Sequence, residues 1–388
     1  MPKKKSKAQK TVEKISKNKY YVTFVVLMFL IIVVAAYFYR KQSDGEDSVG
    51  TESFSGQTVV ETDAIRDLKI TYIDVGQGDA VWIELPDGKN MLVDSGDRPT
   101  ENREKLDRVL SSEGVAKKID YLVATHPDSD HIGQMSYIYE NYEVGMTFRP
   151  FVKSEKAEAD AFEGSFNDGI SIGNVTEVYY SFLDAVRKEG TPYTFFYDGS
   201  DICGTAVVGE TEYVYEIDFM MPHVLTLADY SKDNPNNFSA IFMLRYAGRN
   251  FLFTGDIGNQ STAKRDVEKI FADAYRDNAQ ADCDVLKVAH HGSESSSSAE
   301  FLNVVKPEYA VISCGLENKY KHPTREAIDR LIVSNAKILR TDLQGNVVFI
   351  VDSEGRMTCE TQTSANDAYI FEDYFAVVDL IAQGKIVK

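Results

Sequence analysis

Cysteine is scarce in this chain of 388 residues, which contains four of them. The spacing of Cys203, Cys283, Cys314 and Cys359 matches no zinc-binding motif, and it selects none of the three disulfide pairings that four cysteines allow. Cys283 and Cys314 lie in or beside apolar runs, so we expect both to be small buried residues. The cysteines therefore predict neither a zinc site nor a disulfide.

Positive charge is also scarce outside the N-terminus. The formal net charge of the whole chain is −18, and residues 1–39 hold eight lysines against one glutamate, or +7, which leaves −25 for residues 40–388. A body this acidic argues against binding of long nucleic acid by a broad basic face. It does not exclude a local basic groove.

Residues 1–19 form a basic arm, and residues 20–39 carry no charge. Twenty residues at a rise of about 1.5 Å each span a hydrocarbon core of about 30 Å. Tyrosines bracket the run as interfacial anchors do, and the residues after Ala36 are aromatic, which fits a signal-peptide cleavage site poorly. We predict an uncleaved transmembrane helix that contacts membrane lipid over residues 20–39. The lysines place the N-terminus in the cytoplasm and the body outside the cell membrane.

Residues 40–64 are rich in small and acidic residues without apolar periodicity, so we predict a flexible linker there. Residues 65–388 show no internal repeat and are expected to form one domain. Strands are predicted at 69–75, 79–85 and 90–94 as a meander, then at 120–124, 194–197, 216–220, 240–246, 251–256, 284–289, 309–313, and as a final hairpin at 338–342 and 346–351. Helices are predicted at 102–112, 179–188, 260–272, 325–333 and 368–381. Alternating strands and helices indicate an α/β fold with mixed sheets covered by helices.

The densest group of polar residues is Thr-His-Pro-Asp-Ser-Asp-His at positions 125–131. It follows the apolar segment 121–124, so it is expected to be a loop at the end of a buried strand. Two imidazoles and two carboxylates within six residues supply the nitrogen and oxygen ligands that a divalent cation needs.

Five of the six histidines lie in short polar loops after apolar runs. They are His126, His131, His290, His291 and His322. Asp256 likewise ends the apolar strand predicted at 251–256. His223 lies outside this pattern, and we expect it to be an ordinary loop histidine.

These residues predict a cluster that holds two divalent cations about 3.5–4 Å apart, with Asp256 shared between them. The predicted ligands are His126, Asp128, Asp130, His131, Asp256 and one of His290, His291 and His322. The cations would lower the pKa of a shared water and supply the nucleophile. Asp94, and more weakly Asp79, would orient a ligand histidine.

Several motifs resemble, in the same order, the ComEC competence-protein family, whose hydrolase domains belong to the metallo-β-lactamase superfamily. The motifs are at 74–80 (Asp-Val-Gly-Gln-Gly-Asp-Ala), 93–96, 125–131, 236–239, 254–256, 286–293, 322–323 and 341–345. The resemblance covers about residues 68–352. It implies a four-layer αββα sandwich with the site at one edge between the two sheets.

The resemblance also implies phosphodiester hydrolysis, as a nuclease acting on incoming DNA. Asp128 stands where the superfamily often has a second histidine, which favours manganese while leaving zinc open. By analogy with phosphodiesterase branches, His290 or His291 donates the proton to the leaving oxygen and His322 completes the second metal, with the reverse assignment also open. Asp130 counts both as a ligand and among the catalytic candidates.

Two features depart from the family pattern. Between His131 and Asp256 only His223 is available as the usual third histidine ligand, and it is poorly placed. Asn237 and Ser239 occupy that region instead and are expected to contact metal-bound water or phosphate, and Ser293 is a further candidate for substrate contact. The single predicted membrane span gives no support for a channel role.

The sequence therefore predicts a membrane-anchored hydrolase with two Mn or Zn ions, acting on DNA as a phosphodiesterase or nuclease. The alternative substrate is a cell-envelope phosphodiester of the teichoic-acid type. The acidic body mildly favours a small or confined substrate. A non-catalytic binding module on the same fold is disfavoured because histidine motifs are present at both ends of the site, and β-lactam hydrolysis is disfavoured further. No protein partner is predicted.

Overall fold

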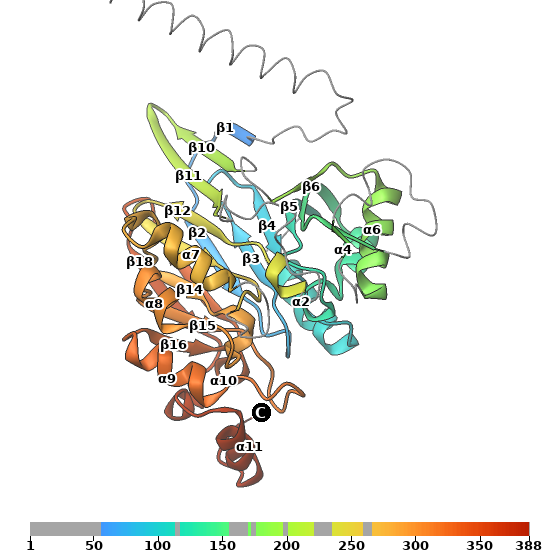
Figure 1. Cartoon of the computed structure of the whole chain (residues 1–388). Coiled ribbons are helices and arrows are strands. Elements are labelled where there is room, and N and C mark those ends of the chain that lie inside the picture. Colours follow the sequence, from blue (N-terminus) through green and yellow to red (C-terminus); the bar gives the residue numbers. More distant parts are fainter. Residues whose placement is uncertain are drawn as a thin grey trace, which may run out of the picture. The chain divides into compact units, whose positions relative to one another are not determined.

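Two eight-stranded mixed sheets and the helices that cover them make up the part of the chain visible in the computed structural model (Figure 1). The structure describes residues 56–112, 117–154, 170–171, 176–196, 201–220, 235–258 and 266–387. All of these residues lie within one compact unit, Glu52–Lys388. The sheets pack face to face, so the architecture is mixed α/β with two sheets at its centre.

The first sheet has the strand order β18-β17-β2-β3-β4-β5-β6-β9. Its strands are β2 (Leu68–Tyr72), β3 (Val81–Glu84), β4 (Asn90–Val93), β5 (Lys118–Val123), β6 (Glu143–Arg149), β9 (Tyr193–Phe195), β17 (Val347–Val351) and β18 (Met357–Thr361). Strands β2, β3 and β4 form an antiparallel meander, and β4, β5, β6 and β9 then run parallel. The predicted meander at the start of the domain is confirmed.

The second sheet has the order β1-β10-β11-β12-β13-β14-β15-β16. Its strands are β1 (Gly56–Glu61), β10 (Ile202–Val208), β11 (Thr211–Phe219), β12 (Phe242–Tyr246), β13 (Arg249–Phe253), β14 (Val285–Lys287), β15 (Tyr309–Ile312) and β16 (Lys337–Arg340). Strands β13 to β16 are parallel to one another. A short pair, β7 (Val152–Lys153) with β8 (Ile170–Ser171), stands apart from both sheets.

Helices flank both sheets (Figure 1). The longer helices are α2 (Thr100–Ser112), α4 (Met135–Asn141), α6 (Glu177–Glu189), α7 (Val267–Tyr275), α8 (Ala299–Val305), α9 (Arg325–Val333) and α11 (Tyr374–Ala382). Single helical turns occur at α3 (Ser129–Ile132), η3 (Pro235–Phe238), η4 (Ala279–Ala281), η5 (Ala289–Gly292), α10 (Thr341–Gln344) and η6 (Asp367–Tyr369). Helix α9 has the predicted bounds, and the Thr324 hydroxyl caps it by accepting from the Ala327 amide at 3.4 Å.

Alternating side chains on the strands fill two apolar cores. In β12, Phe242 and Leu244 belong to the core between the sheets, whereas Met243 belongs to a second cluster that includes Phe271 of α7 and Phe301 of α8. Successive residues of a strand point to opposite faces, so one strand serves both cores. Both faces of each sheet are therefore covered, and the strand ends are left as the place for polar side chains.

The predicted hairpin of 338–342 with 346–351 is wrong. Strand β16 pairs with β15 in the second sheet, whereas β17 pairs with β2 and β18 in the first sheet. The helical turn α10 and Gly345, with φ of 69°, carry the chain from one sheet to the other. A glycine between two short apolar runs is a local signal that favours a hairpin, whereas the pairing is decided by distant strands.

The predicted linker 40–64 is also wrong in part, because residues 56–61 form β1 and pair in parallel with β10. The tail helix predicted at 368–381 is observed as η6 followed by α11. The predicted basic arm 1–19, the predicted membrane span 20–39 and the start of the linker lie outside the described residues. Within the part of the chain that is described, none of the helices has the length and apolar character needed to cross a membrane.

Candidate metal centre

The predicted ligands meet where strands of both sheets end. The loop after β5 carries His126, and the short helix α3 that follows it carries His131. Asp256 follows β13, and the histidine pair His290 and His291 follows β14. Parallel strands present their carboxyl ends at one sheet edge, where α/β proteins build sites. The central motif is thus a loop after a buried strand, as the sequence predicts.

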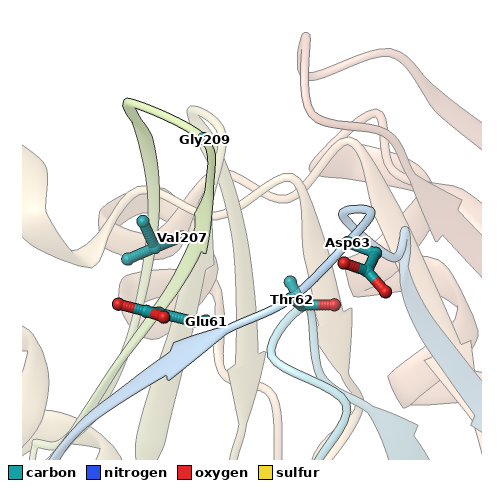
Figure 2. Close-up of a pocket in the computed structure, with 5 residues that line it drawn as sticks. All are labelled: Glu61, Thr62, Asp63, Val207 and Gly209. Carbon is teal, nitrogen blue, oxygen red and sulfur yellow. The ribbon is translucent and has the colours of Figure 1, made fainter.

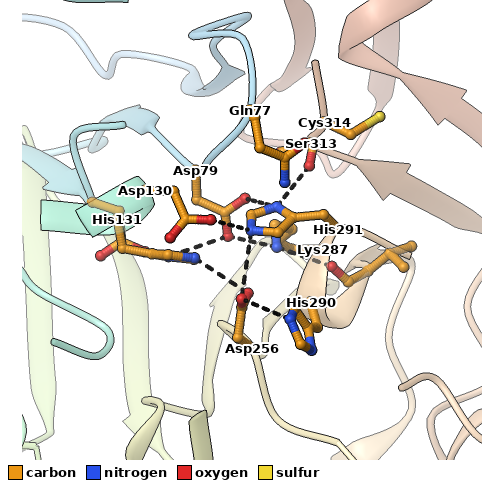
Figure 3. Close-up of polar contacts among 12 residues, drawn as sticks. Gln77, Asp79, Asp130, His131, Asp256, Lys287, His290, His291, Ser313 and Cys314 are labelled. Carbon is orange, nitrogen blue, oxygen red and sulfur yellow. Dashed lines mark hydrogen bonds and ion pairs between the residues drawn. The ribbon is translucent and has the colours of Figure 1, made fainter. Parts of the chain in front are cut away.

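Asp256 lies at the centre of this group. Its carboxylate oxygens are 3.3 Å from Nε2 of His131, 3.4 Å from Nε2 of His291, and 3.8 Å from Nε2 of both His126 and His290. Figure 3 shows three of these imidazoles directed at the Asp256 carboxylate. The Asp256 side chain is 4% exposed, so the convergence is buried. The predicted bridging position of Asp256 fits this geometry.

A carboxylate orients His131. The imidazole donates from Nδ1 to Asp94 Oδ2 at 2.7 Å, which leaves Nε2 to face Asp256. Asp94 in turn accepts from the Thr125 amide at 2.8 Å and from the Thr125 hydroxyl at 2.6 Å. A carboxylate on the far nitrogen fixes the tautomer of a ligand histidine and raises its basicity. Asp94 therefore holds the position predicted for it.

His291 points into the cluster and His290 lies at its rim. His291 donates from Nδ1 to the carbonyl of Ser313 at 2.8 Å, so its Nε2 faces Asp256 and Asp130, the latter at 3.3 Å. The His290 side chain is 22% exposed, against 1% for His291. Both residues have left-handed backbones, with φ of 49° and 53°. Such strain in non-glycine residues costs on the order of 1 kcal/mol each and collects at functional sites.

Several buried atoms of the cluster have no hydrogen-bond partner within the described part of the chain. They are Nε2 of His126, Nε2 of His131, Nε2 of His291, Oδ1 of Asp256 and Oδ1 of Asp79. An unpartnered buried polar atom costs about 1–3 kcal/mol. Among the described residues, overlapping groups of three, such as His126, His131 and Asp256, bring imidazole nitrogens and carboxylate oxygens within 4.8 Å of one another, which suits a divalent cation. The residues present fit such an ion.

Burial and neighbouring charges set the protonation of these groups. Burial, reinforced by His131, lowers the pKa of His126 to about 3, so its imidazole is neutral near pH 7 as a metal ligand must be. Burial raises the pKa of Asp79, but Lys287, His291 and His131 outweigh it and bring that pKa down to about 2. Burial and the nearby Asp130 raise the pKa of Asp128 to about 6.

Lys287 is a site residue that sequence reasoning missed. Its ammonium group donates to Asp79 Oδ2 at 2.5 Å and to the Val288 carbonyl at 2.9 Å, and the residue is 2% exposed. Asp79 also lies 3.3 Å from Nδ1 of His291, so the pair borders the cluster (Figure 3). A lone lysine in an otherwise apolar strand was the available signal, because such a charge is rarely buried without a partner.

Of three other predicted ligands, His322 and Asp128 lie outside the close groups of ligand atoms, and Asp130 belongs to one of them. The His322 ring is 5.5 Å from the His290 ring, and its Nδ1 has no partner among the described residues. Asp128 precedes the short helix α3, where its carbonyl accepts from the His131 amide at 3.1 Å. Asp130 itself joins His131 and His291 in one close group.

The residues predicted to contact water or phosphate have mixed outcomes. Ser239 is fully buried, and its hydroxyl accepts from the Asp256 amide at 3.0 Å, so it positions the aspartate backbone. Asn237 is 2% exposed and its amide nitrogen has no partner among the described residues. Ser293 accepts from the Ser295 amide at 3.3 Å within its own loop. His223 lies outside the described residues.

Asn236 also contacts the site, and no role is predicted for it from the sequence. Its side-chain nitrogen is 3.4 Å from Nδ1 of His290.

A cavity of about 610 Å³ lies elsewhere, at the edge strands β1 and β10 (Figure 2). Its lining consists of Glu61, Thr62, Asp63, Val207 and Gly209. These residues include no imidazole and no thiol. The cavity therefore offers carboxylates but lacks the imidazoles that gather around Asp256.

Changing Asp94 to asparagine is expected to weaken metal binding by about 10- to 100-fold. The Thr125 amide and His131 Nδ1 donate to different oxygens of Asp94. An asparagine side chain has one acceptor oxygen, so it would present its NH2 group to one of these two donors. Calorimetric titration of metal-stripped protein with Mn²⁺ measures the effect. Asp107→Asn serves as the control, since Asp107 accepts from the hydroxyls of Tyr137 and Tyr142, away from the cluster. Equal affinity in Asp94→Asn and wild type would contradict the orienting role.

Comparison with known proteins agrees with this geometry. Residues 73–145 match the sequence profile described as the metallo-beta-lactamase superfamily. The chain has the metallo-β-lactamase fold.

Curated relatives add a more distant similarity. The chain is 27% identical to ComE operon protein 3 of Bacillus subtilis over 72% of its own length and 33% of that protein. It is 28% identical to Competence protein ComA of Neisseria gonorrhoeae over 77% of its own length and 34% of that protein. The chain thus spans about a third of the length of the curated relatives it matches. Among solved structures, the metallo-beta-lactamase fold protein YhfI of Bacillus subtilis covers 74% of this chain and is itself covered completely, with TM-score 0.39 and 11% identity.

Proposed function

We propose that this protein is a metal-dependent hydrolase of phosphodiesters, held at the cell membrane by residues 20–39. The observation that carries the proposal is the buried cluster around Asp256, in which His126, His131 and His291 each direct an unpartnered Nε2 inward. Groups left without partners in the interior destabilise a fold unless a ligand satisfies them. The metallo-β-lactamase fold supports the assignment to hydrolysis.

The proposed cofactor is a pair of divalent ions, Mn or Zn. Such ions, when bound, lower the pKa of water toward neutrality and offset the negative charge that develops on phosphate. The residues proposed to hold them are His126, Asp128, Asp130, His131, Asp256, His291 and His322. Asp94 and the Ser313 carbonyl keep the two inward histidines in position through their Nδ1 atoms.

His290 is proposed as the proton donor to the leaving oxygen. Its ring lies at the rim, partly exposed, where a substrate bound over the cluster would reach it. The Asn236 amide contacts the ring and limits its rotation. A positioned imidazole typically contributes a rate factor of about 10²–10⁴.

The proposed substrate is DNA outside the cell membrane, and the similarity to proteins named for competence supports it. An envelope polymer such as teichoic acid is the second candidate. The charge of −25 on residues 40–388 favours a small or confined substrate of either kind, because it disfavours a long polyanion held by a broad face.

The proposal is tested with the full chain in detergent, stripped of metal and then supplied with Mn²⁺ or Zn²⁺. Hydrolysis of bis-p-nitrophenyl phosphate, single-stranded DNA and a teichoic-acid fragment is measured in parallel. Metal-dependent cleavage of DNA supports the nuclease function. Cleavage of the wall polymer alone moves the assignment to the second candidate, and no cleavage of any substrate leaves a binding module on this fold.

A further inference from the structure

The loop of residues 315–323 connects β15 to α9 and borders the metal centre. It begins two residues after Ser313, whose carbonyl accepts from His291, and it ends beside His322, whose ring is 5.5 Å from that of His290. None of the groups proposed for hydrolysis needs the exposed residues in the middle of this loop. Those residues are Lys319, Tyr320 and Lys321.

Internal hydrogen bonds hold the loop in one shape. The Asn318 side chain is 5% exposed, donates to the Gly315 carbonyl at 2.8 Å and to the His322 carbonyl at 2.6 Å, and accepts from the His322 amide at 3.1 Å. The Gly315 amide donates to Gln77 Oε1 at 3.3 Å, which ties the loop to the segment between β2 and β3. Any side chain at Gly315 would meet the Gln77 backbone nitrogen at 2.5 Å. These hydrogen bonds therefore hold residues 319–321, in the middle of the loop, in a defined position.

Tyr320 is the exposed aromatic residue of this loop. It is 46% exposed, so much of its ring surface is open to a bound molecule. Its ring stacks on His322 with centroids 6.1 Å apart and an interplanar angle of 15°. The stack continues the line of rings from His290 outward, so an aromatic group of a substrate bound at the metal centre could extend it.

A lysine flanks Tyr320 on each side in the sequence, although the chain as a whole carries a net negative charge. The Lys319 ammonium lies 4.7 Å from the Tyr320 ring centroid, and Lys321 is exposed on the other side in sequence. The interaction with Tyr320 chiefly, and with Asp97 and Asp130 more weakly, raises the pKa of Lys319, so Lys319 lies within electrostatic reach of the site. A cation next to the ring disfavours a cationic substrate group there and favours the phosphates of a polyanion.

We propose that Tyr320 is a stacking platform for a nucleobase of a single-stranded nucleic acid, with Lys319 and Lys321 pairing with the adjacent phosphates. This inference rests on the proposed phosphodiester hydrolysis and names the substrate class of the same site. Unpaired bases stack on exposed aromatic rings in single-strand binding proteins, whereas the bases of a duplex already stack on each other. A polyol phosphate polymer has no aromatic face to offer the ring.

The test compares cleavage of a single-stranded oligonucleotide with cleavage of the same strand carrying abasic sites, by the full chain with Mn²⁺. Tyr320→Phe keeps the aromatic face, and Tyr320→Leu keeps only the apolar bulk. Base stacking on an aromatic side chain is worth about 1–3 kcal/mol, so wild type and Tyr320→Phe should prefer the intact strand in kcat/KM by about 5-fold or more. Tyr320→Leu should lose that preference.

A second measurement does not depend on catalysis. An oligonucleotide containing 5-iodouracil is bound and irradiated, and the crosslinked peptide is identified by mass spectrometry, with the crosslink expected at Tyr320. If Tyr320→Leu lowers kcat/KM equally on the intact strand, the abasic strand and the polyol phosphate polymer, the stacking role of Tyr320 is wrong. A crosslink found only at other residues would also contradict it. If wild type cleaves no phosphodiester at all, the proposed function fails, and the crosslink alone then decides the stacking site.

Discussion

Replacing Asp256 with asparagine is expected to reduce hydrolysis by on the order of 10³-fold or more, beyond the 10- to 100-fold typical of a residue that only orients a ligand. The reason is the position of this carboxylate, which lies within 3.8 Å of Nε2 atoms from four histidines. Asparagine has nearly the same shape but no negative charge. It would leave the imidazoles in place while removing the group that two cations would share.

The rate is measured on whichever phosphodiester the metal-loaded wild type cleaves. The matched control is Asp184→Asn on helix α6, where the carboxylate only pairs with Arg187 and Lys188 at the surface. Exposed pairs of this kind contribute about 0–1 kcal/mol to stability, so activity should be unchanged. If Asp256→Asn retains wild-type activity, the cluster is not the catalytic centre.

Replacing Lys287 with methionine is expected to lower the free energy of unfolding by about 3–5 kcal/mol. The amine lies 2.5 Å from Asp79, and both side chains are at most 5% exposed. Methionine fills a similar volume, so little cavity forms. The loss arises because Asp79 keeps its buried negative charge without the ammonium group that balances it.

The effect is measured from the denaturant midpoint and slope of metal-free protein. Lys306→Met is the matched control, because Lys306 and Asp282 form an exposed lysine–aspartate pair at 3.0 Å that should contribute no more than about 1 kcal/mol. The double variant Asp79→Asn with Lys287→Met should recover part of the loss, since contacting residues are not additive. A Lys287→Met protein as stable as the Lys306→Met protein would show that the pair is not a buried ionic contact.

Much of the site was predictable because its ligands follow apolar strands. The pattern at 125–131 and the strand end at Asp256 place their polar groups at sheet edges whatever the order of the strands. The helix at 325–333 was predictable for a similar local reason, since Thr324 marks its start and apolar residues recur at helical spacing. Local signals of this kind survive any tertiary arrangement.

The remaining features depend on contacts between distant residues. The assignment of β16 and β17 to different sheets follows from pairing with β15 and β2, which Gly345 does not encode. The difference between His290 and His291 arises from two consecutive left-handed residues and the Ser313 carbonyl. No periodicity in the sequence specifies which of two adjacent histidines turns inward.

The most direct test of the account is the metal content of the protein. Full-length protein is stripped of metal, equilibrated with Mn²⁺ or Zn²⁺, desalted and measured by elemental mass spectrometry. We expect two ions per chain in wild type and fewer in the Asp256→Asn variant. No retained metal in wild type, or the same content in a variant with His126, His131 and His291 all changed to alanine, would contradict it.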